Sequence, residues 1–349
     1  MMLGIRLLRN PLFMIGTLFI LGLFFTSLGY YFFKNDEIPV IYFLFDENGE
    51  PIKHPYKPTD YFPFGTDHFG RDILYLMLIG TKYTLGIAFA VALLRLLISS
   101  TLGIFFGMFF GKMKKWVASI ADAVNYFPAT LLAYFSLIWV LLYERFYEGG
   151  YSLSFSKQFF IIVIVFTAIA IPTISALVMN ETDRIMKKEF MEGVRVLGAS
   201  KWQMIRKHLM PYLLPQFFMI FLRELIQVLL LLAHLGLLRI FLGGLGITKD
   251  MYDTSREYSI SNEWSGLLGS WWEFIWAGHP QITAVPVLFF TLTILAAKMA
   301  LMGFEQEYNR LSVAPKIIQR SNERSNTILT KKDFKPITVD FKRKRSANE

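Results

Sequence analysis

Long blocks of apolar residues, separated by polar connections, are the feature of this sequence that most constrains its fold. Six such blocks cover residues 11–33, 83–111, 117–143, 159–179, 211–247 and 284–304. A helix of about 20 apolar residues spans the hydrocarbon core of a bilayer. Charged residues make up only 18% of the chain, whereas soluble domains carry about a quarter. The blocks therefore predict an all-α membrane protein with six transmembrane helices.

Two of these blocks need separate interpretation. The first has a long apolar core and ends in interfacial aromatic residues, so we expect an uncleaved span and not a signal peptide. The fifth is too long for one simple span and is interrupted by Arg223, Glu224, His234, Arg239 and several glycines. We expect one helix followed by a broken or re-entrant piece, since irregular backbone at membrane depth needs protein or water beside it.

The charges of the connections alternate along the chain. Residues 34–79 and 249–273 are acidic, whereas residues 112–115 and 180–208 and the tail are rich in lysine and arginine. Basic connections remain in the cytoplasm, which also explains the net charge of +9 without nucleic acid. Both termini are therefore predicted to be cytoplasmic. The predicted organisation is a cytoplasmic N-terminus and first span at 1–33, an extracytoplasmic segment at 34–79, a membrane core at 80–310 with a cytoplasmic loop at 180–212, and a basic cytoplasmic tail at 311–349.

The cytoplasmic loop contains the sequence EFMEGVRVLGASKWQMIRKHLMP at residues 189–211, which predicts two short amphipathic helices with a sharp break. Gly198 can adopt the left-handed conformation that ends the first helix. Ser200 and Gln203 match a capping box for the second, and Pro211 is expected to restart the chain toward the membrane. Such an element could dock into a groove of a partner and pass rigid-body motion to the spans. It could instead lie on the lipid surface.

Four segments, taken in order, resemble a known family. They are FGTDHFGRD at 64–72, DAVNYFPATLLA at 122–133, the segment 189–211 and EWSGLL at 263–268. Together they resemble the C-type permease subunits of oligopeptide and dipeptide ABC importers. The resemblance implies a permease fold of the type I importers with a cytoplasmic coupling helix, in a bacterial inner membrane.

The resemblance also implies a function. The chain would form half of a translocation pathway for peptides, beside a second homologous permease, two cytoplasmic ATPases and an extracytoplasmic substrate-binding protein. The sequence has no glycine-rich phosphate loop, so ATP and Mg are expected on the ATPases, with no cofactor and no enzymatic activity in this chain. The final block departs from the family at KMALMGFEQEY. A non-transporting membrane scaffold or sensor of the same fold is therefore the alternative.

The resemblance assigns roles to two sets of residues. Those expected to contact the ATPase are Glu189, Glu192, Gly193, Gly198, Ala199, Trp202 and Pro211. Those expected to face the binding protein are Gly65, Thr66, Asp67, Gly70, Arg71 and Asp72.

Charged residues inside the predicted spans form a third candidate set: Arg95, Asp122 and Glu224. An ionised side chain at mid-bilayer costs about 2.5–3.5 kcal/mol on insertion scales, so such groups usually face protein or water. We assign these three to the translocation path and hypothesise that Glu224 pairs with Arg95. The alternative is that residues such as Glu224 lie near helix ends and extend to the interface.

Two further segments carry weaker signals. Asp67, His68 and Asp72 have the chemistry of metal ligands, but helix capping by an aspartate and pairing with Arg71 are the favoured interpretation, and no metal site is expected. The tail from residue 316 to 345 is either a solvated, disordered extension or a segment that contacts anionic lipid.

Overall fold

The computed structural model describes residues 2–45, 48–52, 54–110, 113–141, 154–249 and 253–332, with side chains described as far as Leu311. The helices at the start of the chain are α1 (Met2–Leu7), α2 (Pro11–Lys34), α3 (Ile73–Phe109), α4 (Lys114–Asn125), α5 (Ala129–Leu141) and α7 (Phe155–Met186). They are followed by α8 (Glu189–Val196), α9 (Lys201–Gln203), the π-helix η1 (Met204–Leu209) and α10 (Met210–Leu237). The remaining elements are β1 (Leu245–Lys249), β2 (Ser255–Ser259), α11 (Trp264–Trp271), η2 (Trp272–Ile275) and α12 (Pro280–Lys332).

The fold is that of a mostly helical membrane protein, as the apolar blocks predict. Among the described residues, five helices are long and apolar enough to cross a membrane, or six if α4 and α5 together form one span. The all-α prediction omits one small element, the antiparallel hairpin of β1 and β2, in which Leu245 pairs with Ser259.

The third predicted span is not one straight helix. The axes of α4 and α5 differ by 81° at the break between residues 125 and 129. Pro128 lies at this break, and a proline disfavours helical conformation in the preceding residue and donates no hydrogen bond itself. The apolar block therefore continues through a corner that its composition alone does not reveal. Its predicted end, at residues 142 and 143, lies outside the described residues.

The fifth block is broken, as expected, and its helix α10 ends at Leu237. Arg239, Gly243 and Gly244 then adopt left-handed backbone conformations with φ of 60°, 82° and 69°. These residues turn the chain through a buried loop into the hairpin. Two of the three are glycines, which adopt the left-handed conformation without steric cost. The chain continues as a hairpin and not as a re-entrant helix.

Local signals in the sequence explain where several helices begin and end. Asn10 caps α2 by accepting hydrogen bonds from the backbone N–H groups of Leu12 and Phe13, and Pro11 occupies the first helical position. Asp72 caps α3, with 2.8 Å between its Oδ1 and the backbone nitrogen of Leu74. The prediction that an aspartate of the FGTDHFGRD segment caps the helix entering the membrane is therefore confirmed.

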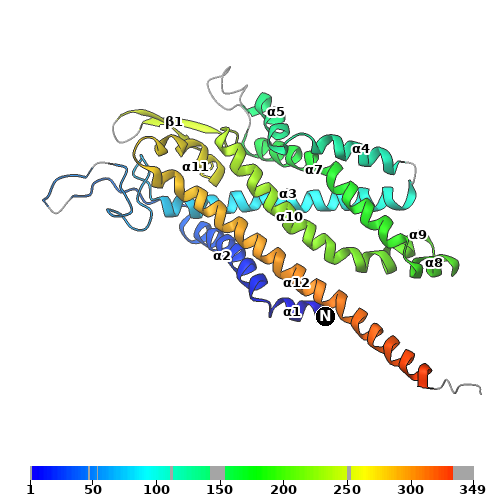
Figure 1. Cartoon of the computed structure of the whole chain (residues 1–349). Helices are drawn as coiled ribbons and strands as arrows, with labels where there is room; N and C mark the ends of the chain where they lie inside the picture. Colours follow the sequence, from blue (N-terminus) through cyan, green and yellow to red (C-terminus); the bar gives the residue numbers. More distant parts are fainter. Residues whose placement is uncertain are drawn as a thin grey trace, which may run out of the picture.

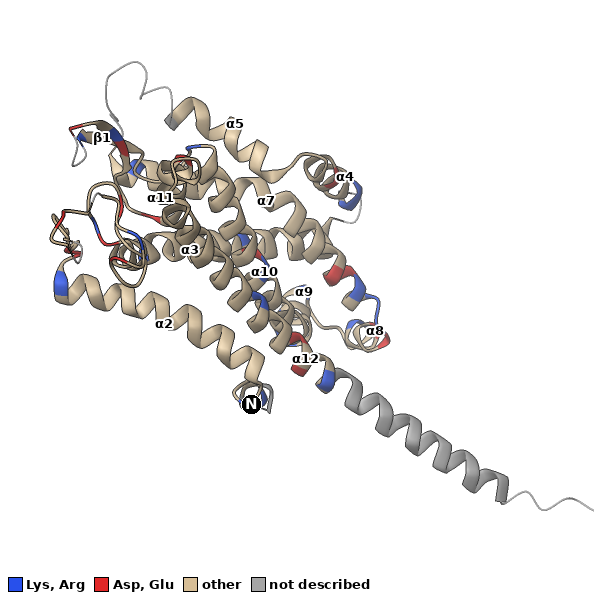
Figure 2. Ribbon diagram, turned by 60° about the vertical axis from the view of Figure 1, so that its left-hand side comes forward, with Lys and Arg blue, Asp and Glu red and all other residues tan. Residues whose placement is uncertain are grey.

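The two ends of the bundle are formed by different elements. Figure 1 shows that β1, α11 and the segment that precedes α3 gather at one end of the bundle, whereas α8 and α9 lie at the other end. Charged residues concentrate near these ends, and most of each long helix is free of them (Figure 2). The two segments for which partner contacts are expected, 64–72 and 189–211, therefore lie at opposite ends of the helices.

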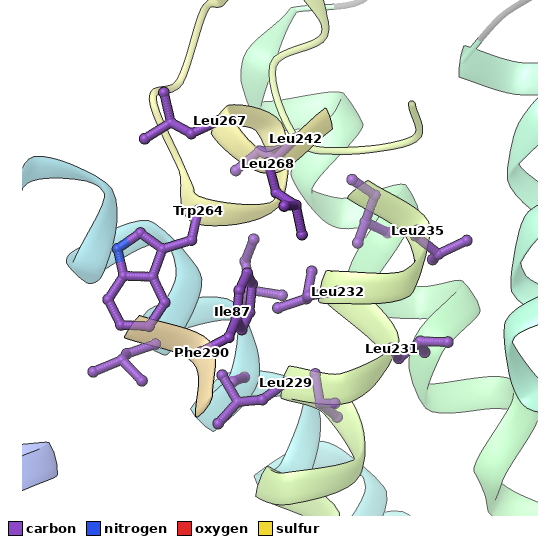
Figure 3. Packing of buried hydrophobic residues seen from close by; sticks show 14 of the residues in the cluster. Ile87, Leu229, Leu231, Leu232, Leu235, Leu242, Trp264, Leu267, Leu268 and Phe290 are labelled. Carbon is purple, nitrogen blue, oxygen red and sulfur yellow. The ribbon is translucent and has the colours of Figure 1, made fainter. Parts of the chain in front are cut away.

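Helix α3 lies at the centre of the bundle and contacts α2, α7, α10, α11 and α12. Near the hairpin end, the fully buried Trp264 of α11 packs edge-on against Phe290 of α12, with ring centroids 5.5 Å apart. Ile87 of α3 and leucines of α10, including Leu232, fill the space beside them (Figure 3). Because interiors pack at the density of organic crystals, this cluster fixes α11 firmly to the bundle.

Candidate functional site

A partly open cavity of about 510 Å³ lies between α3, α4, α5, α7 and α10. Its polar lining comes from five elements or their connections: Arg95, Asn125, Thr130, Thr173, Glu224, Gln227 and His234. Most of these groups lie within predicted spans, where a charged or amide side chain facing lipid is costly. This central cavity therefore needs water or a protein partner on its open side.

Arg95 and Glu224 form an ion pair at the wall of the central cavity. The guanidinium donates to Glu224 Oε2 from Nη1 at 2.8 Å, and the two side chains are only 4% and 14% exposed. Nε and Nη2 both donate to the backbone carbonyl of Phe166, at 2.8 and 2.6 Å. One arginine thus joins α3, α7 and α10, and the hypothesis that Glu224 pairs with Arg95 is confirmed.

Neutral polar groups complete the lining. Thr173 donates a hydrogen bond of 2.9 Å to Asn125 Oδ1, and Thr130 Oγ1 lies 3.3 Å from Nδ1 of His234. Asn125, Thr130, Thr173, Gln227 and His234 were not predicted as site residues from the sequence. A signal was present for Gln227, since it lies three residues after Glu224 and seven before His234, which places all three on one face of α10.

The structure does not bring Asp122 to this cavity. Its side chain is exposed on α4 and borders a separate hollow of about 220 Å³ with Asn125 and Tyr126. Helix α4 is amphipathic and lies beyond the Pro128 corner, so Asp122 is not on the same straight helix as the apolar residues of α5. It therefore does not join Arg95 and Glu224, with which the sequence grouped it.

The segment from α8 to η1 packs one apolar side onto the bundle. Met191, Ile205 and Leu209 are buried against a cluster that includes Val178 and Ile185 of α7. Gly198 follows the end of α8 with a left-handed φ of 80°, and its N–H donates a hydrogen bond to the backbone carbonyl of Arg195. Ser200 and Gln203 form the reciprocal capping box. The predicted break and both predicted caps are confirmed.

The second half of this segment differs from the prediction. The helix is continuous from Lys201 to Leu237, so Pro211 lies inside it and does not begin a new helix toward the membrane. The π-helical turn of η1 precedes the proline and widens the hydrogen-bonding pattern by one residue. This removes the clash that Pro211 would otherwise make with the carbonyl four residues earlier. Continuous helix therefore joins α9 and η1 to α10, whereas α8 is separated from them by the break at Gly198.

The opposite side of the α8–η1 segment is exposed and combines charged side chains with large apolar ones. Val196, Leu197 and Trp202 are 86%, 87% and 69% exposed. Of the residues assigned to ATPase contact, Ala199 is half-buried and the others are exposed: Glu189, Glu192, Gly193, Gly198, Trp202 and Pro211. A rigid base with exposed apolar side chains at its tip has the character of a docking element.

The FGTDHFGRD segment is folded tightly against the other end. Asp67 is fully buried, and its carboxylate accepts hydrogen bonds from the backbone N–H groups of Phe69 and Arg71 and from the Arg71 guanidinium. The backbone of Gly65 and Gly70 is left-handed, with φ of 78° and 72°. Of the six residues assigned to the binding protein, Arg71 is half-buried and the others are buried: Gly65, Thr66, Asp67, Gly70 and Asp72. Because most of these residues are buried, they support the surface at this end of the bundle and contribute little to it themselves.

Glu263 is a buried acid that the sequence analysis did not single out, although it begins the EWSGLL segment. It is fully buried and caps α11, accepting hydrogen bonds from the backbone N–H groups of Ser265 and Gly266 at 3.1 Å and from the Ser265 hydroxyl. Burial raises the pKa of the Glu263 carboxyl above its ordinary value of 4.5, against the opposing effect of these hydrogen bonds. The residue ties α11 to α3 through Thr84, at 3.4 Å.

Comparison with protein families gives one match across this region. The model described as "Binding-protein-dependent transport system inner membrane component" matches residues 99–310. These residues include the central cavity lining from α5, α7 and α10 and the whole α8–η1 segment.

Several curated proteins are similar over part of the chain. The glutathione transport system permease protein GsiD of Pectobacterium atrosepticum is 25% identical over 170 residues, which are 45% of this chain and 52% of that protein. The oligopeptide transport system permease protein OppC of Haemophilus influenzae is 29% identical over 151 residues, 43% of this chain and 44% of that protein. The chain thus spans about half the length of these relatives.

A shorter match is the peptide transport system permease protein SapC of Haemophilus influenzae, with 43% identity over 72 residues, 21% of this chain and 24% of that protein. Among solved structures, a chain of the MetNI methionine ABC transporter in an inward-facing conformation has a TM-score of 0.41 and 16% identity, covering 66% of this chain and 97% of that chain.

Proposed function

This chain belongs to the family of binding-protein-dependent transport system inner membrane components, and from that premise we propose that it is a permease subunit of an ATP-driven importer. It is a multi-pass inner-membrane protein and not an enzyme. We propose peptides as its cargo, because the names of similar permeases describe transport of oligopeptides, peptides and glutathione.

The α8–η1 segment is the single observation that carries the proposal. Its buried side, with Met191 and Leu209, is fixed to α3, α7 and α10, whereas Leu197 and Trp202 extend from the bundle. A partner that grips Trp202 would move α10 as a rigid body, since helix is continuous from Lys201 to Leu237. We therefore propose that the gripping partner is one of two cytoplasmic ATPase subunits, with α8 and both termini on the cytoplasmic side.

The open side of the central cavity supports a second membrane partner. Gln227 and His234 are exposed on α10, a helix apolar enough to cross a membrane, in which a polar side chain that contacts lipid is costly. A second, homologous permease covering this side would complete a polar pathway between the two chains. The hairpin end would then receive an extracytoplasmic binding protein, near the surface that the FGTDHFGRD segment shapes.

The mechanism proposed for this assembly is a population shift between outward-open and inward-open states. Moving such an equilibrium from 1:99 to 99:1 takes about 5.5 kcal/mol of differential free energy. ATP binding and hydrolysis on the partner subunits supply it, and α8 and η1 pass it to the spans. The Arg95 pair, which joins α3, α7 and α10, keeps these helices together during the motion.

A pull-down tests the proposal. The tagged chain is purified from its native membrane in mild detergent, and the associated proteins and any peptide held by an associated binding protein are sequenced. We expect a second permease, two ATPase subunits and ATPase activity that rises when the peptide-loaded binding protein is added. Association without any peptide-stimulated ATPase activity would contradict the proposal and favour a membrane scaffold or sensor.

A further inference from the structure

A second cavity, of about 440 Å³, lies at the α8 end of the bundle between α7, α10 and α12. Its polar lining includes Glu181, Arg184, Gln216, Arg223 and Glu305. It is distinct from the central cavity, with which it shares no lining residue.

The two cavities lie along one seam between α7 and α10. On α7, Thr173 lines the central cavity, and Leu177, Glu181 and Arg184 line the second, at successive spacings of four, four and three residues. Side chains at these spacings share one face of a helix. On α10, Gln216, Met219 and Arg223 of the second cavity precede Gln227 and His234 of the central one with similar spacing. The second cavity therefore lies in line with the central cavity along α7 and α10, on the side toward α8.

The charges of the second cavity are balanced and accessible. Arg184 pairs with Glu181 at 2.8 Å and Arg223 with Glu305 at 2.7 Å. The two arginines are 66% and 55% exposed. Exposed pairs of this kind contribute at most about 1 kcal/mol each, so they exchange partners at little cost. A ligand with only one sign of charge would leave the opposite charges of the site uncompensated, whereas a ligand with both signs would not.

Gln216 adds a neutral polar group between the pairs. Its Nε2 donates to Glu181 at 3.2 Å and so links α10 to α7. Its Oε1 is buried and has no hydrogen-bond partner among the described residues. A buried acceptor without a donor costs free energy, and a bound N–H group would relieve that cost.

We propose that the second cavity is a binding site for a zwitterion, a molecule carrying one ammonium and one carboxylate group, such as a short peptide with free ends. The carboxylate pairs with Arg184 or Arg223, since a guanidinium binds carboxylate through two parallel hydrogen bonds. The ammonium pairs with Glu181 or Glu305, and an N–H of the ligand donates to Gln216 Oε1. The inference rests on the proposed function, because it names a contact of the cargo below the central cavity.

Thiol labelling tests the site directly. The chain has no cysteine, so Met219→Cys introduces its sole thiol inside the second cavity. Leu214→Cys, at a position 60% exposed and outside the cavity lining, is the matched control. Each variant complex is purified from its native membrane into lipid nanodiscs. The labelling rate of this chain is measured with tri-alanine or with N-acetyl-tri-alanine amide, which has no charged ends. We expect tri-alanine alone to slow labelling of M219C several-fold and to leave L214C unchanged.

The charges are tested by neutral substitutions in the M219C background. Arg223→Gln with Glu305→Gln is expected to weaken tri-alanine protection by about tenfold, the effect of losing one charge-assisted contact. The matched control is Lys249→Gln with Asp253→Asn, which neutralises an exposed pair at the hairpin end and is expected to keep full protection. Equal protection in both double variants would overturn the proposal, as would equal protection by the two peptides.

Two outcomes separate this inference from the proposed function. If the wild-type complex has peptide-stimulated ATPase activity but tri-alanine does not change M219C labelling, the zwitterion site is wrong and the importer remains. If the ATPase activity is absent but the protection is present, the importer is wrong and the site stands. A labelling rate that follows the lipid headgroup, in phosphatidylglycerol against phosphatidylcholine nanodiscs, and not the peptide would make the cavity a lipid site and overturn the proposal.

Discussion

Arg95 carries a charge into the helix bundle, and its environment determines what substitution there should do. Its guanidinium is bound by Glu224 and by the Phe166 carbonyl, with almost no exposure. Removing one member of a buried pair leaves the other unpaired, which costs about 3–5 kcal/mol, whereas removing both costs much less.

We therefore expect Arg95→Leu and Glu224→Leu each to lower the unfolding temperature of the detergent-solubilised complex strongly, and the double variant to recover part of the loss. The control cycle uses Arg223 and Glu305, whose exposed pair should show coupling of no more than about 1 kcal/mol. Additive effects of the Arg95 and Glu224 substitutions would show that the pair has no coupling energy.

Glu263 predicts a pH dependence with a definite sign. Burial raises the pKa of this carboxyl in the folded chain above 4.5, so the folded chain keeps a proton that the unfolded chain has released. Stability contributed by this residue is therefore complete below about pH 4.5 and is lost as the pH rises to the folded pKa. Glu263→Gln should remove that loss, because an amide cannot ionise.

Thermal unfolding from acid to neutral pH checks this: the difference in unfolding temperature between Glu263→Gln and wild type should move in favour of the variant as the pH rises. Glu273→Gln, at a carboxyl whose side chain is 61% exposed, is the control and should not show this trend. A constant difference between Glu263→Gln and wild type would refute the account.

At the scale of elements, the break between α8 and α9 is the feature on which the proposed coupling depends. Gly198 holds φ at 80°, which proline cannot adopt, and the space around its Cα is open. Gly198→Pro is expected to abolish ATP-driven peptide uptake in cells while leaving the amount of chain in the membrane unchanged.

Gly49→Pro is the matched control, since Gly49 has φ of 79° and equally open surroundings but lies at the opposite end of the bundle. Uptake should survive that change. Normal uptake by the Gly198→Pro variant would count heavily against a coupling role for α8 and η1.

At the scale of the whole molecule, the proposed function requires the two ends of the bundle to lie on opposite sides of a membrane. Leu197 of the α8 end is 87% exposed, and Ile247 of the hairpin is 71% exposed. In the cysteine-free chain, we expect a membrane-impermeant thiol reagent to label Ile247→Cys in intact cells and to label Leu197→Cys only after the membrane is opened. Labelling of Leu197→Cys from outside would place the proposed ATPase-binding surface where no cytoplasmic ATPase reaches it.

The sequence by itself determined the class of fold, the number of apolar blocks and the local caps. These depend on properties that act over a few residues: the length of an apolar run, the left-handed freedom of Gly198, and the side-chain oxygens of Asp72 and Ser200. The pairing of Arg95 with Glu224 was also predictable as a hypothesis, because two opposite charges inside spans have few other partners.

Only the tertiary structure decided which distant groups share a cavity. Asp122 and Arg95 are equally unusual in an apolar block, but the Pro128 corner removes Asp122 from the central cavity and brings in Asn125. Nothing in the sequence marks Thr173 and Gln227 as site residues, and they share a cavity only because α7 and α10 lie side by side. For the same reason, Glu181 and Arg223 line one cavity. Helix direction and packing angle arise from side chains far apart in the sequence, so no local pattern contains them.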